Sequence, residues 1–184
     1  MRLATLLLIG LMLLATSALA EKAPFEYGTF NGTFDRQGGD TIASAVPITA
    51  LPFSGAGTTV GYTNDYDAVC PYTGSTSPDV VYSFTPSLTC LLDITLCANS
   101  LYDTKLYVLD AAQSVVACND DECPGFVSEL VAANGTSVPV TGGQLYYIVV
   151  DGYSGASGTY TIDVTGDCFT PAEDNSFSTV KSLF

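Results

Sequence analysis

The sequence predicts an all-β protein, an antiparallel jelly-roll β-sandwich held together by disulfide bonds. Three observations favour this class. Short runs of residues alternate between apolar and polar side chains, turn-forming residues separate the runs at short intervals, and no amphipathic helix of useful length occurs. Many short strands joined by Gly-rich turns are typical of sandwiches and jelly rolls.

Residues 1–20 have the form of a signal peptide. A positive charge at Arg2 precedes an apolar run over residues 3–15, and Ala18-Leu19-Ala20 has the small-x-small form of a cleavage site. The apolar run is shorter than the roughly 20 residues that a membrane-spanning helix needs. We therefore expect cleavage before Glu21 and secretion of the mature chain, without insertion into the membrane.

The mature chain divides into three predicted parts. Residues 21–39 are Gly-rich and aperiodic, which predicts a leader or linker. Residues 40–168 carry the strand patterns and are predicted to form one domain, with Asp40 capping a short helical turn at its start. Residues 169–184 depart from the strand pattern and are predicted to be a C-terminal tail.

The predicted strands follow one another along the domain. A period of two with one apolar face indicates antiparallel strands packed on one side, and this pattern occurs over residues 80–85, 92–96, 105–108 and 159–164. Residues 145–150 are apolar on both faces. They are therefore predicted to form a central strand that is buried from both sides.

The charge and composition of the chain restrict its function. It has 19 acidic residues, 5 basic residues and no histidine. Such a charge disfavours binding to nucleic acids and anionic membranes, and it suits calcium, cationic partners or simple solubility. Ser–His and Cys–His catalysis both need an imidazole base, which the chain lacks. A pair of carboxylates acting as in glycoside hydrolases remains open as an enzymatic alternative.

All six cysteines lie beyond the predicted signal peptide, and an even number in an exported chain predicts three disulfides. Without histidine or paired C-x-x-C motifs, a zinc site is disfavoured. Cys118 and Cys123 are close enough in sequence to close a turn. Cys90 opens one predicted strand and Cys168 follows another, so the two meet if these strands are antiparallel. The predicted pairs are thus Cys118–Cys123, Cys90–Cys168 and, from the remaining two cysteines, Cys70–Cys97.

Six short motifs occur in order along the domain, at residues 64–67, 79–84, 102–108, 117–121, 146–153 and 158–162. Together they resemble the bacterial pre-peptidase C-terminal-like domain family over about residues 40–164. The resemblance implies a jelly-roll β-sandwich of a secreted bacterial protein, non-catalytic and often accessory to exported peptidases. Some members of this family bind calcium, and some of those bind collagen-like or other extracellular polymers.

A calcium site is predicted within and beside the segment between Cys118 and Cys123. Calcium takes six to eight oxygen ligands from carboxylates, amides and carbonyls. The candidate ligands are Asp103, Asn119, Asp120 and Asp121, and Asp40 and Asp65 are further candidates nearer the start of the domain. The alternative is that the short acidic side chains accept backbone N–H groups in turns.

The chain has 11 tyrosines and no tryptophan. Three tyrosines fall on apolar strand faces and are predicted to be core residues: Tyr82, Tyr147 and Tyr160. Four others lie in turn-rich segments and are predicted to form a surface that stacks on sugars or peptides: Tyr62, Tyr66, Tyr72 and Tyr153.

Taken together, the sequence predicts a secreted, non-catalytic module that calcium could stabilise. It would bind an extracellular polymer or protein, or act as an accessory to exported proteins. Two alternatives stay open: a structural or surface-layer component, and a small carboxylate-dependent hydrolase.

Overall fold

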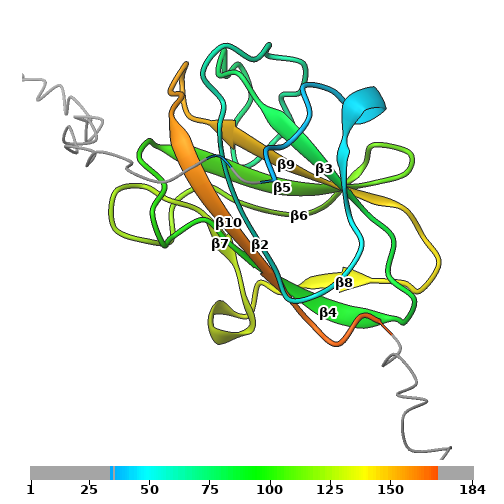
Figure 1. Ribbon diagram of the computed structural model, residues 1–184. Coiled ribbons are helices and arrows are strands. Elements are labelled where there is room, and N and C mark those ends of the chain that lie inside the picture. Colours follow the sequence, from blue (N-terminus) through cyan, green and yellow to red (C-terminus); the bar gives the residue numbers. More distant parts are fainter. Residues whose placement is uncertain (1–33, 35, 170–184) are drawn as a thin grey trace, which may run out of the picture.

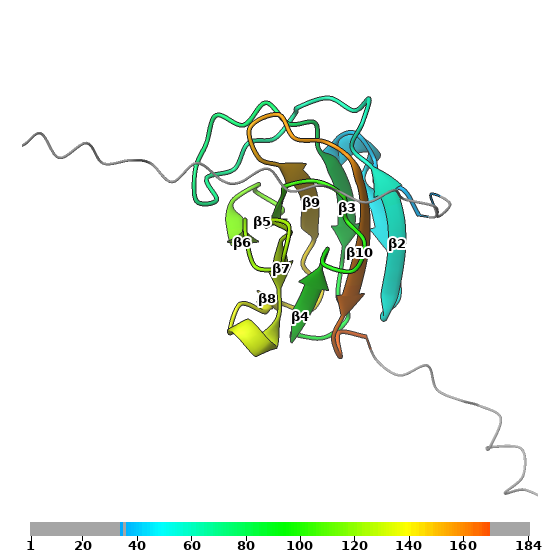
Figure 2. The same cartoon turned by 90° about the vertical axis from the view of Figure 1, so that its left-hand side faces the viewer.

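The computed structural model describes Phe34 and residues 36–169. The predicted signal peptide, most of the 21–39 segment and all of the 169–184 tail except Phe169 lie outside the described residues. Ten strands form two five-stranded sheets that pack face to face (Figures 1 and 2). The predicted all-β, two-sheet, disulfide-bonded architecture is thereby confirmed.

The first sheet has the strand order β1-β3-β9-β5-β6, and the second has the order β2-β10-β4-β7 with β8 paired to β4. The pairs are antiparallel, except that β1 runs parallel to β3. The strands are β1 (Val46–Ile48), β2 (Phe53–Thr58), β3 (Val80–Phe84), β4 (Cys90–Thr95), β5 (Thr104–Asp110), β6 (Val115–Asn119), β7 (Glu129–Leu130), β8 (Val138–Val140), β9 (Tyr146–Gly152) and β10 (Thr159–Thr165).

The helical content of the described residues is two short 3₁₀ helices, η1 (Ile42–Ser44) and η2 (Ala132–Asn134). Neither has the length or the apolar character needed to cross a membrane.

The main core lies between the two sheets and is built from alternate residues of each strand. Leu106 and Val108 of β5 and Ile148 and Val150 of β9 point into it and are fully buried. The period of two in the sequence produces this arrangement, because successive side chains of a strand point to opposite faces. The predicted core residues Tyr82 and Tyr160 meet there with their hydroxyls 2.8 Å apart.

The outer face of the first sheet is also covered, and this gives the molecule a second, smaller core. Tyr107 and Leu109 of β5 pack there with Val81 and Val149. The covering layer comes from η1 and from the long connection between β2 and β3, residues 59–79, which we call the cover loop. The central position of β9 and its burial on both faces are as predicted. Expecting β5 to be packed on one side only was wrong, because the cover loop lies over its other face.

The disulfides join Cys70 to Cys118, Cys90 to Cys168 and Cys97 to Cys123. The second pair is the one predicted. The predicted pairs Cys118–Cys123 and Cys70–Cys97 are wrong. Cys118 lies on the outer face of the first sheet, beside the smaller core, whereas Cys123 packs against the main core between the sheets. The two are close in sequence, but they face opposite sides of one layer, so each bonds a cysteine on its own side.

Candidate functional site

The predicted site residues converge on one end of the sandwich. Because β5 is antiparallel to both β6 and β9, the start of β5 meets the ends of its two neighbours at the same edge. Asp103 precedes β5, Asp120 and Asp121 follow β6, and Tyr153 follows β9. The backbone N–H of Tyr153 donates to the carbonyl of Asp103 over 3.1 Å, which fixes two of these segments together.

Three carboxylates gather at this edge. Asp103, Asp120 and Asp121 each offer one carboxylate oxygen, and these oxygens all lie within 4.8 Å of one another. Asp103 and Asp120 are half-buried and Asp121 is exposed. The set contains oxygen donors alone, which is the chemistry that calcium prefers, and its three negative charges suit a divalent cation. The residues therefore fit the predicted calcium site, and we call them the acidic cluster.

The other candidate ligands lie elsewhere. The amide of Asn119 donates to Glu122 Oε2 over 3.3 Å and accepts the N–H of Glu129 over 3.1 Å, so both of its polar atoms bond residues outside the acidic cluster. Asp40 and Asp65 both bond Thr63 in the cover loop, Asp40 through the Thr63 N–H at 2.9 Å. Asp40 thus bonds a backbone N–H of the cover loop and does not cap η1, whose N-cap is Thr41, and Asp65 bonds the Thr63 hydroxyl.

The segment that carries Asp120 and Asp121 is anchored on both sides. Cys118 ties the end of β6 to Cys70 of the cover loop, and Cys123 ties the same segment to Cys97 beyond β4. The hydroxyl of Ser128 donates to the carbonyl of Asp120 over 2.6 Å. The segment is therefore held by two disulfides and by one hydrogen bond to a backbone carbonyl.

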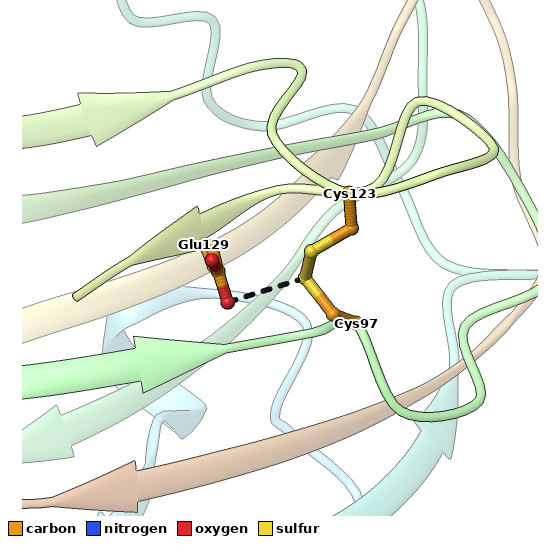
Figure 3. A group of neighbouring side chains, drawn as sticks. All are labelled: Cys97, Cys123 and Glu129. Carbon is orange, nitrogen blue, oxygen red and sulfur yellow. Dashed lines mark hydrogen bonds between the residues drawn. A yellow bond between two sulfur atoms is a disulfide. The ribbon is translucent and has the colours of Figure 1, made fainter. Parts of the chain in front are cut away.

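Figure 3 shows the second of these disulfides with Glu129 beside it. Glu129 Oε2 lies 3.4 Å from Cys97 Sγ and accepts the hydroxyl of Thr95 over 3.1 Å. Two cysteines and a glutamate at this distance would suit a soft metal if the sulfurs were thiolates. They are bonded to each other instead, so the group is a structural cross-link, and its contact with Glu129 is not a hydrogen bond from sulfur.

Two of the four predicted surface tyrosines meet beside the acidic cluster. The rings of Tyr72 and Tyr153 pack edge to face, with centroids 4.9 Å apart and planes at 88°. Together with residues 73–75 and Ser154 they line an open pocket of about 310 Å³. The Tyr72 hydroxyl donates to Asp120 Oδ1 over 2.9 Å. Burial and the neighbouring carboxylates raise the pKa of Tyr72, so its hydroxyl stays protonated as a donor.

The other two predicted surface tyrosines lie in structural positions. Tyr62 packs against the main core. Tyr66 packs in the smaller core, and its hydroxyl accepts the N–H of Ile42 over 2.8 Å. The structure thus brings Tyr72 and Tyr153 together and separates Tyr62 and Tyr66 from them.

A buried network of ionisable groups lies directly beneath Tyr72, and no pattern in the sequence predicted it. Lys105 Nζ sits 5.1 Å from the Tyr72 ring centroid, 3.0 Å from Asp67 Oδ1 and 3.7 Å from Asp151 Oδ2. Lys105 and Asp151 have no exposed surface. Burial opposes ionisation of Asp67, but bonds from the Gly74 N–H and from Lys105 outweigh it, so the pKa of Asp67 lies below its ordinary value.

Asp79, at the end of the cover loop, is also fully buried. Its Oδ2 accepts the N–H groups of Asp65 at 2.9 Å and Tyr66 at 3.0 Å, while its Oδ1 is buried without a hydrogen-bond partner in the structure. Burial is the main cause that raises the pKa of Asp79 to about 7. Asp79 therefore holds the cover loop through hydrogen bonds that do not require its charge.

No protein-family model matches the chain, and no curated protein matches it in sequence. Several solved structures are similar to it, among them the following two. One is the pre-peptidase C-terminal domain of a collagenase from Bacillus anthracis, with 14% identity and a TM-score of 0.41 over 73% of this chain and 100% of that one. The other is a periplasmic inhibitor of g-type lysozyme from Aeromonas hydrophila, with 11% identity and a TM-score of 0.41 over 72% of this chain and 99% of that one. A domain of the family that the sequence resembles is thus among the similar solved structures, and a likeness at this level carries nothing about function.

Proposed function

We propose that this chain is a secreted, non-catalytic module that binds an extracellular polymer or protein through the edge formed by Tyr72 and Tyr153. Calcium bound at Asp103, Asp120 and Asp121 would stabilise this edge. The observation that carries the proposal is the position of the acidic cluster, which lies next to the tyrosine-lined pocket and is joined to it by the Tyr72–Asp120 hydrogen bond.

The two tyrosines suit a binding surface. Tyr153 has 38% of its surface exposed, although it packs against the Tyr72 ring. A partly exposed tyrosine ring offers a large apolar area and a polar hydroxyl, which serve for contacts with sugars or with peptide groups. The pocket beside it is open and lined by small polar residues, so a ligand would approach from the surface of the molecule.

Calcium would act here as a structural cross-link. Asp103 lies before β5 and the two other acids lie after β6, so an ion held by all three would fasten neighbouring strand ends and the turn between β6 and β7. It would also neutralise repulsion within the acidic cluster, which matters in a chain whose net charge is −14. Through Asp120 it would keep Tyr72 in position.

Two features support secretion and binding rather than catalysis. Three disulfides are typical of proteins that fold in an oxidising compartment. The chain has no histidine, so it lacks the commonest general base and the usual partner of a nucleophilic serine or cysteine.

Calcium is expected to raise the melting temperature of the purified protein, and EDTA is expected to abolish this effect. Asp121→Asn removes one carboxylate from the exposed side of the cluster and should weaken calcium binding about tenfold or more. Thermal melts over a calcium titration measure both effects, because a ligand that binds the folded state alone stabilises it by mass action. The matched control is Asp167→Asn. It makes the same charge change just after β10, at the end of the sandwich away from the acidic cluster. A melting temperature that is insensitive to calcium and EDTA would refute the metal site.

Tyr153→Ala is expected to abolish binding to any ligand that the protein retains on an array of glycans and extracellular-matrix proteins. Tyr153→Phe keeps the ring and should retain binding. Because Tyr153 is exposed, neither change should lower the melting temperature by more than a few degrees. Ligand binding that survives Tyr153→Ala at full strength would place the binding surface elsewhere.

A further inference from the structure

The buried lysine beneath Tyr72 has the surroundings of a reaction site. Lys105 of β5 stands directly opposite Asp151 of β9 in the register of the two antiparallel strands. Its Nζ is 3.7 Å from Asp151 Oδ2, and both side chains are completely buried. A second carboxylate, Asp67 of the cover loop, contacts the same Nζ at 3.0 Å. One amine therefore lies between two carboxyl groups, one fully buried and one partly exposed.

The walls of this site are aromatic and apolar. The Tyr72 and Tyr107 rings face Lys105 Nζ with centroids at 5.1 Å and 5.5 Å, and Val149 and Leu109 complete the smaller core around them. Removal from water disfavours the charged form of the buried acid. Burial is the main cause that raises the pKa of Asp151 to about 7, so a large fraction of this group is the neutral acid at neutral pH.

We propose that Lys105 and Asp151 join in an intramolecular amide bond, an isopeptide cross-link between β5 and β9. The Lys105 ammonium first gives one proton to Asp67. Nζ of Lys105 then attacks Cγ of Asp151, and the Cγ–Oδ2 bond breaks. After the attack a second Nζ proton leaves with the Asp151 hydroxyl as water. The products are one amide and one water molecule, and the first proton passes from Asp67 to solvent.

The groups around Asp151 are placed for this reaction. The backbone N–H of Gly152 donates to Asp151 Oδ1 over 2.7 Å, which stabilises the negative charge that develops on this oxygen during the attack. The Tyr107 hydroxyl lies 3.5 Å from Asp151 Oδ2, on the side of the departing oxygen. The Asp67 side chain is 27% exposed, so it can pass its proton to water. The reaction needs no cofactor and no oxidant.

Asp151, rather than Asp67, is the expected electrophile. Asp67 accepts the N–H of Gly74 over 2.5 Å as well as the bond from Lys105, and these interactions favour its ionised form, the form that accepts the proton from Lys105. An ionised carboxylate resists attack by an amine, whereas a neutral carboxylic acid does not carry the repelling charge. The proposal goes beyond the binding function, and neither calcium binding nor ligand binding depends on it.

Trypsin provides the test, because the chain has few cleavage sites. The basic residues are Arg2, Lys22, Arg36, Lys105 and Lys181. If Lys105 is free, digestion of the denatured, reduced and alkylated secreted protein yields peptides 37–105 and 106–181. If Lys105 is acylated, trypsin does not cleave after it, and a single product spanning residues 37–181 appears. Cleavage after Arg36 and Lys181 in the same digest is the internal control.

Mass spectrometry completes the test. We expect the intact reduced protein to be lighter than its sequence by one water molecule, and fragmentation to link Lys105 to Asp151. Asp151→Ala should restore the full mass and cleavage after Lys105, whereas Asp163→Asn, a control on β10, should change neither. A wild-type protein of full mass that is cut completely after Lys105 overturns the proposal, as does a link from Lys105 to Asp67. These wild-type results decide the question even if the Asp151→Ala variant fails to fold.

Discussion

Replacing Asp79 with asparagine is expected to stabilise the protein at pH 8 and to leave its stability at pH 4 nearly unchanged. Asparagine keeps the oxygen that accepts the N–H groups of Asp65 and Tyr66, and it cannot ionise. At pH 4 the buried Asp79 is protonated in the folded protein, so the wild type and the variant make the same hydrogen bonds. At pH 8 the wild type carries a buried charge that the variant lacks.

The direction of the stability change follows from the number of protons that the folded and unfolded states bind. In the unfolded chain Asp79 titrates near its ordinary pKa of about 4, whereas in the folded protein its pKa is about 7. Between these values the folded state binds more protons, so the stability contributed by Asp79 is complete below about pH 4 and is lost as the pH rises to about 7. A difference of about three pKa units corresponds to about 4 kcal/mol at pH 8.

Urea unfolding of both proteins at several pH values between 4 and 8 measures the effect. An Asp151 that is joined to Lys105 does not titrate in either protein. In a free Asp151 burial, which is the same in both proteins, is the main cause that raises the pKa, ahead of the charge of Asp79, and the pKa of Asp67 is lowered in both. The difference between variant and wild type therefore reports mainly on Asp79. Asp163→Asn is the charge-matched control. A variant whose stability falls with pH as steeply as that of the wild type would show that Asp79 does not hold the cover loop in its neutral form.

The strands and the acidic cluster could be predicted from the sequence because both depend on local rules. Alternation identified β3, β4, β5 and β10, and a run apolar on both faces identified the central strand β9. Asp103, Asp120 and Asp121 come together because the start of one strand and the end of its antiparallel neighbour share an edge.

The cover loop could not be predicted, because residues 59–79 have no periodicity and form no regular element over most of their length. Without it, Lys105 and Tyr107 have the pattern of the exposed face of β5, and Asp67, Asp79 and Asp151 have the pattern of solvated acids. The same loop explains the errors in disulfide pairing. Cys118 faces the layer that the loop forms, and no spacing rule places Cys70 in that layer.

Changing Cys70 and Cys118 to alanine removes the disulfide between them and is expected to lower the stability of the protein strongly. This bond closes a loop of 48 residues. The loop-closure estimate for such a length is a loss of about 4 kcal/mol in the free energy of unfolding. It also fastens the cover loop to β6 beside the acidic cluster, so the loss should be accompanied by local opening there.

Hydrogen exchange can separate the local effect from the global one. The amides of Asp65 and Tyr66 donate to the buried Asp79, so their protection reports whether the cover loop is closed. We expect these amides to exchange faster in the Cys70→Ala/Cys118→Ala variant than in a Cys90→Ala/Cys168→Ala variant, when both are compared at equal global stability. The second disulfide closes a longer loop of 78 residues at the other end of the sandwich. It should therefore stabilise the fold at least as much without holding the cover loop.

The outcome distinguishes two ways of holding the cover loop over Lys105. If the Asp65 and Tyr66 amides lose their protection, the disulfide keeps the loop closed, and the Asp67–Lys105 contact alone is insufficient. If they remain protected, the buried contacts of Asp67 and Asp79 hold the loop without the disulfide. In the first case opening the loop should also free Tyr72 from Asp120, so the same variant should bind calcium more weakly than the Cys90→Ala/Cys168→Ala protein. Equal calcium affinity in the two variants would mean that Tyr72 and the acidic cluster act independently.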